Sequence, residues 1–345
     1  MSEEISPDIP PPFRLSAMIS SLWVPQAIYA AAALGIADVL AAGPTRSDEL
    51  AASVGAHPGA LRRLLRALTI LDIVAERDDG RHELTPLGSC LRKDSRDSVR
   101  SWAMLWGSER TLHSWSRIVD CVRTGDSVPA LEGGGSFDHI AADPEAAAEF
   151  NQSMVEHTKK LAGAIPLAYD FSGIRTIVDV GGGWGALLPA ILARYPEMRG
   201  TVFDLPHCRD GANRTFAKTH LAERCEFVAG SFFEAVQPAG ADAYILKNVI
   251  HDWNDEQSVT ILRNCRAAMA PGSRLLLVEA VVPERTGSSD FDRMIVSADV
   301  NMLIVTGGLE RSEAEFRRLL ETAGLRLGCI VPTVAMLSVI EAWPV

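Results

Sequence analysis

The chain has 345 residues, a length that predicts two domains. Hydrophobic residues make up 47% of it, which is enough for a large core and excludes a disordered chain. The formal net charge of −11 argues against a nucleic-acid partner, because a phosphate backbone attracts basic surfaces. The six cysteines are scattered without metal-ligand spacing, so we expect free thiols, no metal site and a reducing, cytoplasmic compartment.

Residues 1–12 are acidic and rich in proline, which predicts a disordered tail and not a signal peptide. No uninterrupted apolar stretch approaches the roughly 20 residues that a membrane helix needs. We therefore expect a soluble protein that has no membrane partner.

Residues 13–100 predict a winged helix-turn-helix domain. An alanine-rich amphipathic stretch over 20–40 precedes two short helices, at 45–55 and 57–71, and a β-hairpin over 73–85. Such domains commonly read DNA, and three arginines cluster on the second helix, Arg62, Arg63 and Arg66. However, residues 1–100 carry 11 Lys and Arg against 13 Asp and Glu, a net charge of −2, so we favour dimerisation over DNA binding.

Residues 101–162 predict a helical connector that contributes to a substrate pocket, and its last helix spans 144–161. Strands and helices alternate over 163–345, which predicts an α/β fold with a doubly wound, Rossmann-like parallel sheet. The expected strands are 176–180, 200–204, 225–229, 242–247, 274–280, 325–331 and 335–341, of which the last two form an antiparallel hairpin. The expected helices are 184–194, 208–221, 255–269 and 312–323.

The segment 177–185 carries the strongest functional signal. It reads as a buried strand, Ile177 to Val180, followed by four glycines within five positions. Such a turn lets a ligand approach bare backbone. A second apolar strand ends in Asp204, about 20 residues beyond the loop, where doubly wound sheets bind a ribose diol. Together these features predict a cofactor that contains adenosine.

Two cofactors compete for this loop. Gly181, Gly183 and Ala186 fit the dinucleotide fingerprint loosely. The carboxylate of Asp179, just before the glycines, would repel a pyrophosphate and attract an amine or a sulfonium. The pattern Asp-x-Gly-x-Gly-x-Gly is also the first motif of methyltransferases that use S-adenosylmethionine, so the loop favours that cofactor over NAD.

A second group of residues predicts acid–base chemistry. Lys247 and His251 follow the expected fourth strand, on the rim where open α/β sheets bind ligands. A neutral imidazole accepts a proton near pH 7. Glu279 ends the fifth strand and Glu310 follows a glycine pair, so either carboxylate is placed to orient an imidazole. A surface salt bridge is the alternative for each acid, and the residues alone favour that alternative only for Glu310.

Five segments in chain order resemble one family. They are Asp179-Val-Gly-Gly-Gly, Phe203-Asp-Leu-Pro, Gly230-Ser-Phe-Phe, Leu246-Lys-Asn-Val-Ile-His-Asp-Trp and Gly307-Gly-Leu-Glu-Arg. The pattern is similar to the plant caffeate-type and bacterial polyketide or phenazine O-methyltransferases, which act on small molecules. The resemblance covers nearly the whole chain, including the winged-helix start and Phe150-Asn-x-x-Met154.

The resemblance implies three groups of site residues. The catalytic group is His251 as general base with Glu279 and Glu310 beside it. The expected cofactor residues are Thr158, Asp179, Gly181, Gly183, Asp204, Leu205, Ser231, Phe232 and Lys247. The expected residues around an aromatic acceptor are Phe150, Met154, Asp252, Asn301 and Met302. Ser231 stands where relatives often have an acid, and Asn301 stands where many are apolar.

The family implies O-methylation of a phenolic hydroxyl on an aromatic secondary metabolite, with S-adenosyl-L-methionine as donor and S-adenosyl-L-homocysteine as product. Hydroxylation, decarboxylation or N-methylation of an aromatic metabolite is the alternative, and the sequence does not name the acceptor. The apolar stretch over 20–40 and the family resemblance both favour a homodimer, in which Met18 or Trp23 reaches the partner's pocket.

Overall fold

The computed structural model describes residues 9–137 and 142–345, and it divides the chain into two compact units between His113 and Ser114. Residues 1–8 of the expected tail lie outside the described part, and a helix begins at Pro11, inside that expected tail. The division falls within the expected connector over 101–162.

The first unit combines helices with a small sheet. Its helices are α1 (Pro11–Ile19), η1 (Ser20–Leu22), α2 (Trp23–Leu34), α3 (Ile36–Leu40), α4 (Ser47–Ser53), α5 (Pro58–Ile70), η2 (Gly88–Leu91) and α6 (Arg100–Gly107). Strands β1 (Thr45–Arg46), β3 (Arg81–Leu84) and β2 (Val74–Glu76) form an antiparallel sheet in that order. The two helices and the hairpin that the sequence predicts are therefore present. The stretch over 20–40 breaks at Gly35, whose φ of +70° ends α2.

The segment Pro11–Leu34 corrects one expectation. This stretch of 24 residues is long and apolar enough to cross a membrane by length and composition alone, with a mean hydropathy of 1.4 in its most apolar window. Only 17% of that window is buried. The apolar run is not continuous in the sequence, because three prolines and three serines lie within it. The same property suits a helix that packs against another protein chain.

The second unit is built on a sheet of seven strands in the order β11-β12-β8-β7-β4-β5-β6. All neighbouring strands are parallel except β12, which is antiparallel to both β11 and β8. The bounds are β4 (Thr176–Val180), β5 (Arg199–Asp204), β6 (Cys225–Ala229), β7 (Ala243–Lys247), β8 (Arg274–Glu279), β11 (Leu325–Pro332) and β12 (Ser338–Pro344). The doubly wound sheet and its antiparallel C-terminal hairpin are confirmed.

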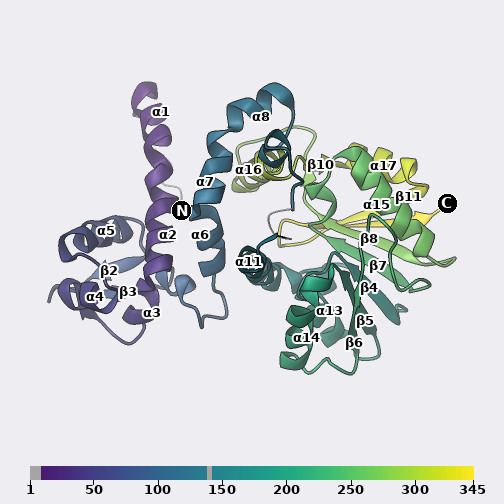
Figure 1. Ribbon diagram of the computed structural model, residues 1–345, viewed down its shortest axis with the longest axis horizontal. Helices are drawn as coiled ribbons and strands as arrows, with labels where there is room; N and C mark the ends of the chain where they lie inside the picture. Colours follow the sequence, from purple (N-terminus) through teal and green to yellow (C-terminus); the bar gives the residue numbers. More distant parts are fainter. Residues whose placement is uncertain (1–8, 138–141) are drawn as a thin grey trace. The chain divides into compact units, whose positions relative to one another are not determined.

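Helices cover both faces of this sheet. On one side lie α13 (Leu188–Arg194) and α14 (Arg209–Lys218), and on the other lie α15 (Asp255–Ala268) and α17 (Glu313–Thr322) (Figure 1). Successive strand residues supply the two cores: Ile245 is buried with α13 and α14, whereas Tyr244 and Leu246 are buried with α15 and α17. This alternation explains why the strands are apolar almost without interruption.

Other elements precede or extend this layer. The helices α7 (Glu109–Ser116), α8 (Ile118–Thr124), α9 (Val128–Leu131), α11 (Pro144–Ala162) and α12 (Ile165–Ala168) come before β4, and α7 crosses the division between the units. The short helices η3 (Pro206–Cys208) and η4 (Ile250–Asp252) follow β5 and β7. Strands β9 (Val281–Val282) and β10 (Arg311–Ser312) pair in parallel beside the main sheet. Between them runs α16 (Asp290–Val305), which the sequence reading did not predict.

Several predicted boundaries differ from the structure, and the starts of α13 and β12 have clear physical causes. Helix α13 begins at Leu188 and not at 184, because Gly181, Gly183 and Gly185 all have positive φ and the loop continues past them. Strand β12 begins at Ser338 and not at 335, because Met336 has a φ of +67° and belongs to the turn.

The strand order places the functional rim. The chain runs outward from β4 through β5 to β6, then returns to the other side of β4 for β7 and β8. The reversal lies between β4 and β7, and open α/β sheets bind their ligands at the carboxyl ends of the strands on either side of such a point. The glycine loop follows β4 and the helical turn η4 follows β7, so both belong to this rim.

Candidate active site

The glycine loop is packed against the side chain that precedes it. A Cβ atom at Gly182 would lie 2.6 Å from the carboxyl group of Asp179, so only glycine fits there. Asp179 is 1% exposed, and its Oδ2 has no hydrogen-bond partner among the described residues. Burial, aided by Asp204 and opposed by Lys247, raises the pKa of Asp179 to about 7.

Asp204 connects the loop to the second strand. Its Oδ2 accepts the Gly183 N–H at 2.7 Å, and its Oδ1 accepts the Leu205 N–H at 2.6 Å. Burial raises the pKa of Asp204, and these two hydrogen bonds oppose that rise. Each carboxylate oxygen keeps a second lone pair, so the group can also accept the two hydroxyls of a ribose. The orphaned Asp179 oxygen, the bare glycine backbone and Asp204 together fit a bound adenosyl group.

The remaining expected cofactor residues lie on the same unit but not all on the same element. Ser231 and Phe232 follow β6, and the Ser231 hydroxyl accepts the Phe233 N–H at 3.3 Å. Lys247 ends β7. Burial lowers its pKa to about 8, although the carboxyl groups of Glu279, Asp179 and Asp252 act to raise it. Thr158 is buried on α11, and Leu205 is exposed beside Asp204.

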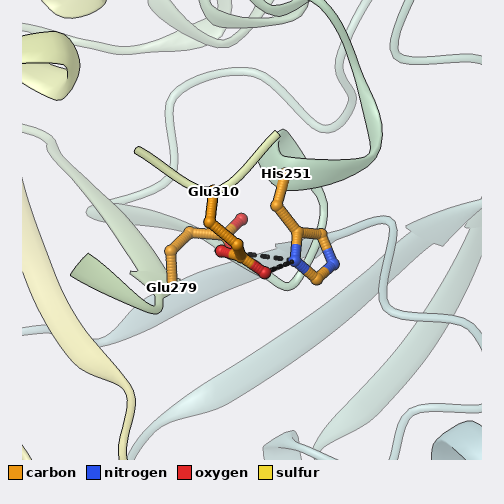
Figure 2. A group of neighbouring side chains, drawn as sticks. All are labelled: His251, Glu279 and Glu310. Atoms are coloured by element: carbon orange, nitrogen blue, oxygen red, sulfur yellow. Dashed lines mark hydrogen bonds and ion pairs between the residues drawn. The ribbon is translucent and has the colours of Figure 1, made fainter. Parts of the chain in front are cut away.

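His251, Glu279 and Glu310 meet at the rim, as the sequence predicts (Figure 2). The Nδ1 atom of His251 lies 2.8 Å from Oε1 of Glu310 and 3.9 Å from Oε2 of Glu279. Each acid is nearly enclosed, so neither forms the surface salt bridge that was the alternative. The other His251 nitrogen, Nε2, lies 3.8 Å from Oδ1 of Asp252, which is too long for a hydrogen bond.

Glu279 also holds the backbone that carries the histidine. Its Oε1 accepts the N–H groups of Val249 at 3.0 Å and Ile250 at 2.9 Å, the two residues before His251. Its Oε2 and the Oε2 of Glu310 have no hydrogen-bond partner among the described residues. Burial raises the pKa of Glu279 to about 7, although the His251 charge opposes that rise.

The imidazole sits in a strongly negative surrounding. Burial by itself lowers the pKa of His251, but the carboxyl groups of Glu279, Asp252 and Glu310 outweigh it and raise the pKa to about 10. Burial raises the pKa of Asp252 to about 6 against the His251 charge. A proton gained by His251 therefore changes the proton affinity of Glu279 and Asp252.

The cluster holds residue types that bind metals, and its donor atoms lie within 4.8 Å of one another. The 2.8 Å between Nδ1 and Oε1 is a hydrogen-bond length. Two ligands that each lie about 2.1 Å from a tetrahedral zinc ion are farther apart than that. The arrangement therefore fits a shared proton better than a metal ion.

Aromatic side chains gather around Trp253, close in sequence to His251. The Phe137 ring lies 6.1 Å from the Phe150 ring on α11 and 5.4 Å from the Trp253 ring, and Trp253 follows His251 by two residues. The Phe232 ring lies 5.9 Å from Trp253. The structure therefore brings Phe150 and Phe232, from the expected acceptor and cofactor groups, to the same aromatic cluster. Phe137 and Trp253 were not predicted as site residues.

The other expected acceptor residues are on two helices. Met154 lies one turn after Phe150 on α11, and Asn301 and Met302 lie near the end of α16. Met302 is buried, and its carbonyl accepts the N–H groups of Thr306 and Gly307. Asn151, next to Phe150, is buried with its Oδ1 3.4 Å from where a Gly183 Cβ would be, so α11 packs against the glycine loop.

Comparisons with known proteins agree with this geometry. Residues 115–326 match the model of the O-methyltransferase domain, and residues 16–94 match that of the O-methyltransferase dimerisation domain. The chain is 41% identical to a phenazine O-methyltransferase of Lysobacter antibioticus over 329 residues, 95% of each chain.

Solved structures match over the same extent. A mitomycin 7-O-methyltransferase superimposes with a TM-score of 0.88 at 34% identity, covering 97% of this chain and 98% of that one. An O-methyltransferase from neocarzinostatin biosynthesis, solved with S-adenosyl-L-homocysteine and 1,4-dihydroxy-2-naphthoic acid, has a TM-score of 0.79 at 34% identity, covering 95% and 98%. The chain therefore belongs to the family of S-adenosylmethionine-dependent O-methyltransferases that act on small molecules.

Proposed function

We propose that this O-methyltransferase methylates a phenolic hydroxyl of an aromatic metabolite and that His251 is its general base. The observation that carries the proposal is the pairing of His251 Nδ1 with Glu310 at 2.8 Å. That hydrogen bond occupies one ring nitrogen and orients the ring, which leaves Nε2 to accept a proton from the acceptor.

The proton affinity of His251 suits a phenol. A free phenol has a pKa of about 10 and is a poor nucleophile while protonated. Because the surrounding carboxyl groups raise the pKa of His251 to about 10, proton transfer between the two groups is nearly balanced. When bound, S-adenosylmethionine supplies an electrophilic methyl group on a positively charged sulfur, and a nearby positive charge favours the neutral imidazole.

The cofactor roles follow the rim geometry. We propose that Asp204 accepts the ribose hydroxyls and that Leu205, Ser231 and Phe232 border the adenine. Gly181, Gly183, Thr158 and Lys247 are proposed to line the methionine part. Asp179, whose carboxyl group packs against the glycine loop, is proposed to belong to the same cofactor site. Isothermal titration with S-adenosylhomocysteine tests this, and Asp204→Asn is expected to weaken binding about tenfold or more.

An aromatic acceptor is supported by the rings of Phe150 and Trp253, with Met154, Asn301, Met302 and Asp252 proposed around it. Other relatives in the family include an 8-amino-8-demethylriboflavin N,N-dimethyltransferase and an aclacinomycin 10-hydroxylase, at 34% and 35% identity. Mass spectrometry of the product separates the reactions, because methylation adds CH₂, hydroxylation adds an oxygen and decarboxylation removes carbon dioxide. Fragmentation then assigns the new methyl group to oxygen or nitrogen.

The base is tested by His251→Ala. A general base contributes about 10²–10⁴ to the rate, so we expect kcat to fall by that factor while S-adenosylhomocysteine binds as in the parent protein. The measurement is steady-state turnover beside calorimetric binding. Turnover close to that of the parent protein would remove His251 from this role.

A further inference from the structure

We propose that Arg311 is a positioning residue, whose guanidinium fastens the backbone turn that carries His251 to the strand that follows Glu310. The proposal rests on the proposed role of His251 as the base. Arg311 lies in β10, directly after Glu310, and is 1% exposed. A guanidinium is almost never enclosed without strong hydrogen-bonding partners, so its contacts define what it does.

Those contacts are with the backbone on both sides of the histidine. Arg311 Nη1 donates to the carbonyl of Ile250 at 3.1 Å, and Nη2 donates to the carbonyl of Trp253 at 2.9 Å. These two carbonyls bracket His251 and Asp252. Nη1 also lies 3.4 Å from the Leu309 carbonyl, and Nη2 lies 3.3 Å from the Ser258 hydroxyl.

The ion pair of Arg311 is the weaker part of this arrangement. Its Nε and Nη2 reach Oδ1 of Asp255 at 3.0 and 2.8 Å. However, the Asp255 side chain is 74% exposed, so water screens that attraction. The hydrogen bonds to the enclosed carbonyls are not screened by water in this way. They depend on the planar, forked arrangement of the guanidinium N–H groups as well as on its charge.

Glu279 and Arg311 bind the backbone of the same turn, one through its N–H groups and the other through its C=O groups. Glu279 accepts the N–H groups of Val249 and Ile250, and Arg311 donates to the C=O groups of Ile250 and Trp253. The two clamps are themselves joined, because β10 pairs with β9 in the register Arg311↔Val281, two residues after Glu279. The turn is therefore fixed at both ends relative to both acids.

Holding the turn in place matters for the contact between His251 and Glu310. His251 and Glu310 are 59 residues apart in the chain, yet their side chains must meet at hydrogen-bond distance. A displacement of about 0.5 Å is enough to spoil such a constellation. Arg311 is the one described side chain that is bonded to the histidine turn and adjacent in sequence to its partner acid.

The test compares Arg311→Lys and Arg311→Ala with the matched control Arg317→Ala, an exposed arginine paired with Glu313 on α17. Lysine keeps the charge but cannot span two carbonyls. Groups that orient a reactive imidazole from outside contribute about 10- to 100-fold, so we expect kcat to fall by that factor in both variants with KM nearly unchanged. The control should keep its kcat.

Two further readouts separate positioning from loss of fold. Looser contact with Glu310 lowers the pKa of His251, so the acid limb of the pH–rate profile should move to lower pH in both variants. Free guanidinium at millimolar concentration should restore part of the kcat of Arg311→Ala and none of that of His251→Ala. If Arg311→Ala does not fold, the kcat of Arg311→Lys and the position of the acid limb in its pH–rate profile test the proposal.

The possible failures are distinguishable. Parental turnover in His251→Ala overturns the base itself, and the role of Arg311 falls with it. A second outcome overturns the role of Arg311 alone. In it, His251→Ala has a reduced kcat, whereas Arg311→Lys keeps the parental kcat and its acid limb stays in place. The role of Arg311 is also overturned if the Arg311 variants melt at a lower temperature but keep the parental kcat per folded molecule.

Discussion

The charge of His251 is set by single carboxyl groups, and Glu279 is the one that can be neutralised with least disturbance. In Glu279→Gln the amide oxygen still accepts the N–H groups of Val249 and Ile250, but the negative charge is lost. Burial then lowers the pKa of His251 with less opposition, so the pKa falls below about 10. Because the base acts when deprotonated, the acid limb of kcat/KM against pH should move to lower pH.

The control for that shift is Glu313→Gln, an exposed carboxyl on α17 that is not part of the cluster. Its profile should coincide with that of the parent enzyme. An acid limb that stays in place in Glu279→Gln would mean that the group titrating in the rate is not His251, or that Glu279 is already protonated there.

At this scale, the sequence predicts side chains whose chemistry is visible in a motif. His251, Glu279 and Glu310 come together as the resemblance implies. Arg311 ends the fifth of the family segments, but its role was not predicted, because its partners are backbone carbonyls and these are not visible in the sequence. The near-complete burial of Asp179 was not visible in the motif, because burial depends on how the loop packs against its carboxyl group.

At the scale of elements, the glycine pair before Glu310 determines how closely two segments approach. A Cβ atom at Gly308 would lie 2.0 Å from the His251 carbonyl oxygen and 2.5 Å from the Asp252 carbonyl carbon. Since both contacts are backbone, Gly308→Ala must displace the turn, and we expect kcat to fall about tenfold or more. Turnover and thermal melting are measured together.

The matched control is Gly163→Ala, at the end of α11. No atom lies within 4 Å of a Cβ built there, and its φ of −64° is accessible to alanine. This variant should be as active as the parent enzyme and up to about 1 kcal/mol more stable. Parental turnover in Gly308→Ala would show that the turn can move without harm to the site.

The sequence predicted an element correctly where its hydrophobic pattern is unambiguous. The strands β4 and β6 have the predicted bounds, because each is a short, mostly apolar run that ends at a glycine. Helix α16 was missed because buried Ile295 and exposed Met294 and Val296 alternate without helical periodicity. Its capping box, formed by Ser289 and Asp292, was the available signal.

At the scale of the whole molecule, the first unit leaves an apolar surface that needs a partner. The residues exposed on α1, η1 and α2 include Phe13, Leu15, Met18, Ile19, Leu22 and Trp23. Residues 16–94 match a dimerisation domain, so we propose that a second copy of the chain covers this surface. The strip also has the length and apolarity of a membrane helix, so the test must separate the two partners.

We expect the parent protein to sediment as a dimer at micromolar concentration and Ile19→Asp to shift it toward the monomer, because a charge in an apolar interface is costly to bury. Val334→Asp, which changes an equally apolar and fully exposed side chain on the second unit, should remain a dimer. A parent protein that sediments as a monomer would contradict the dimer, and one that is monomeric and also floats with phosphatidylglycerol vesicles would assign the strip to a membrane. In a dimer the strip is already covered, so the same vesicles should leave it in solution.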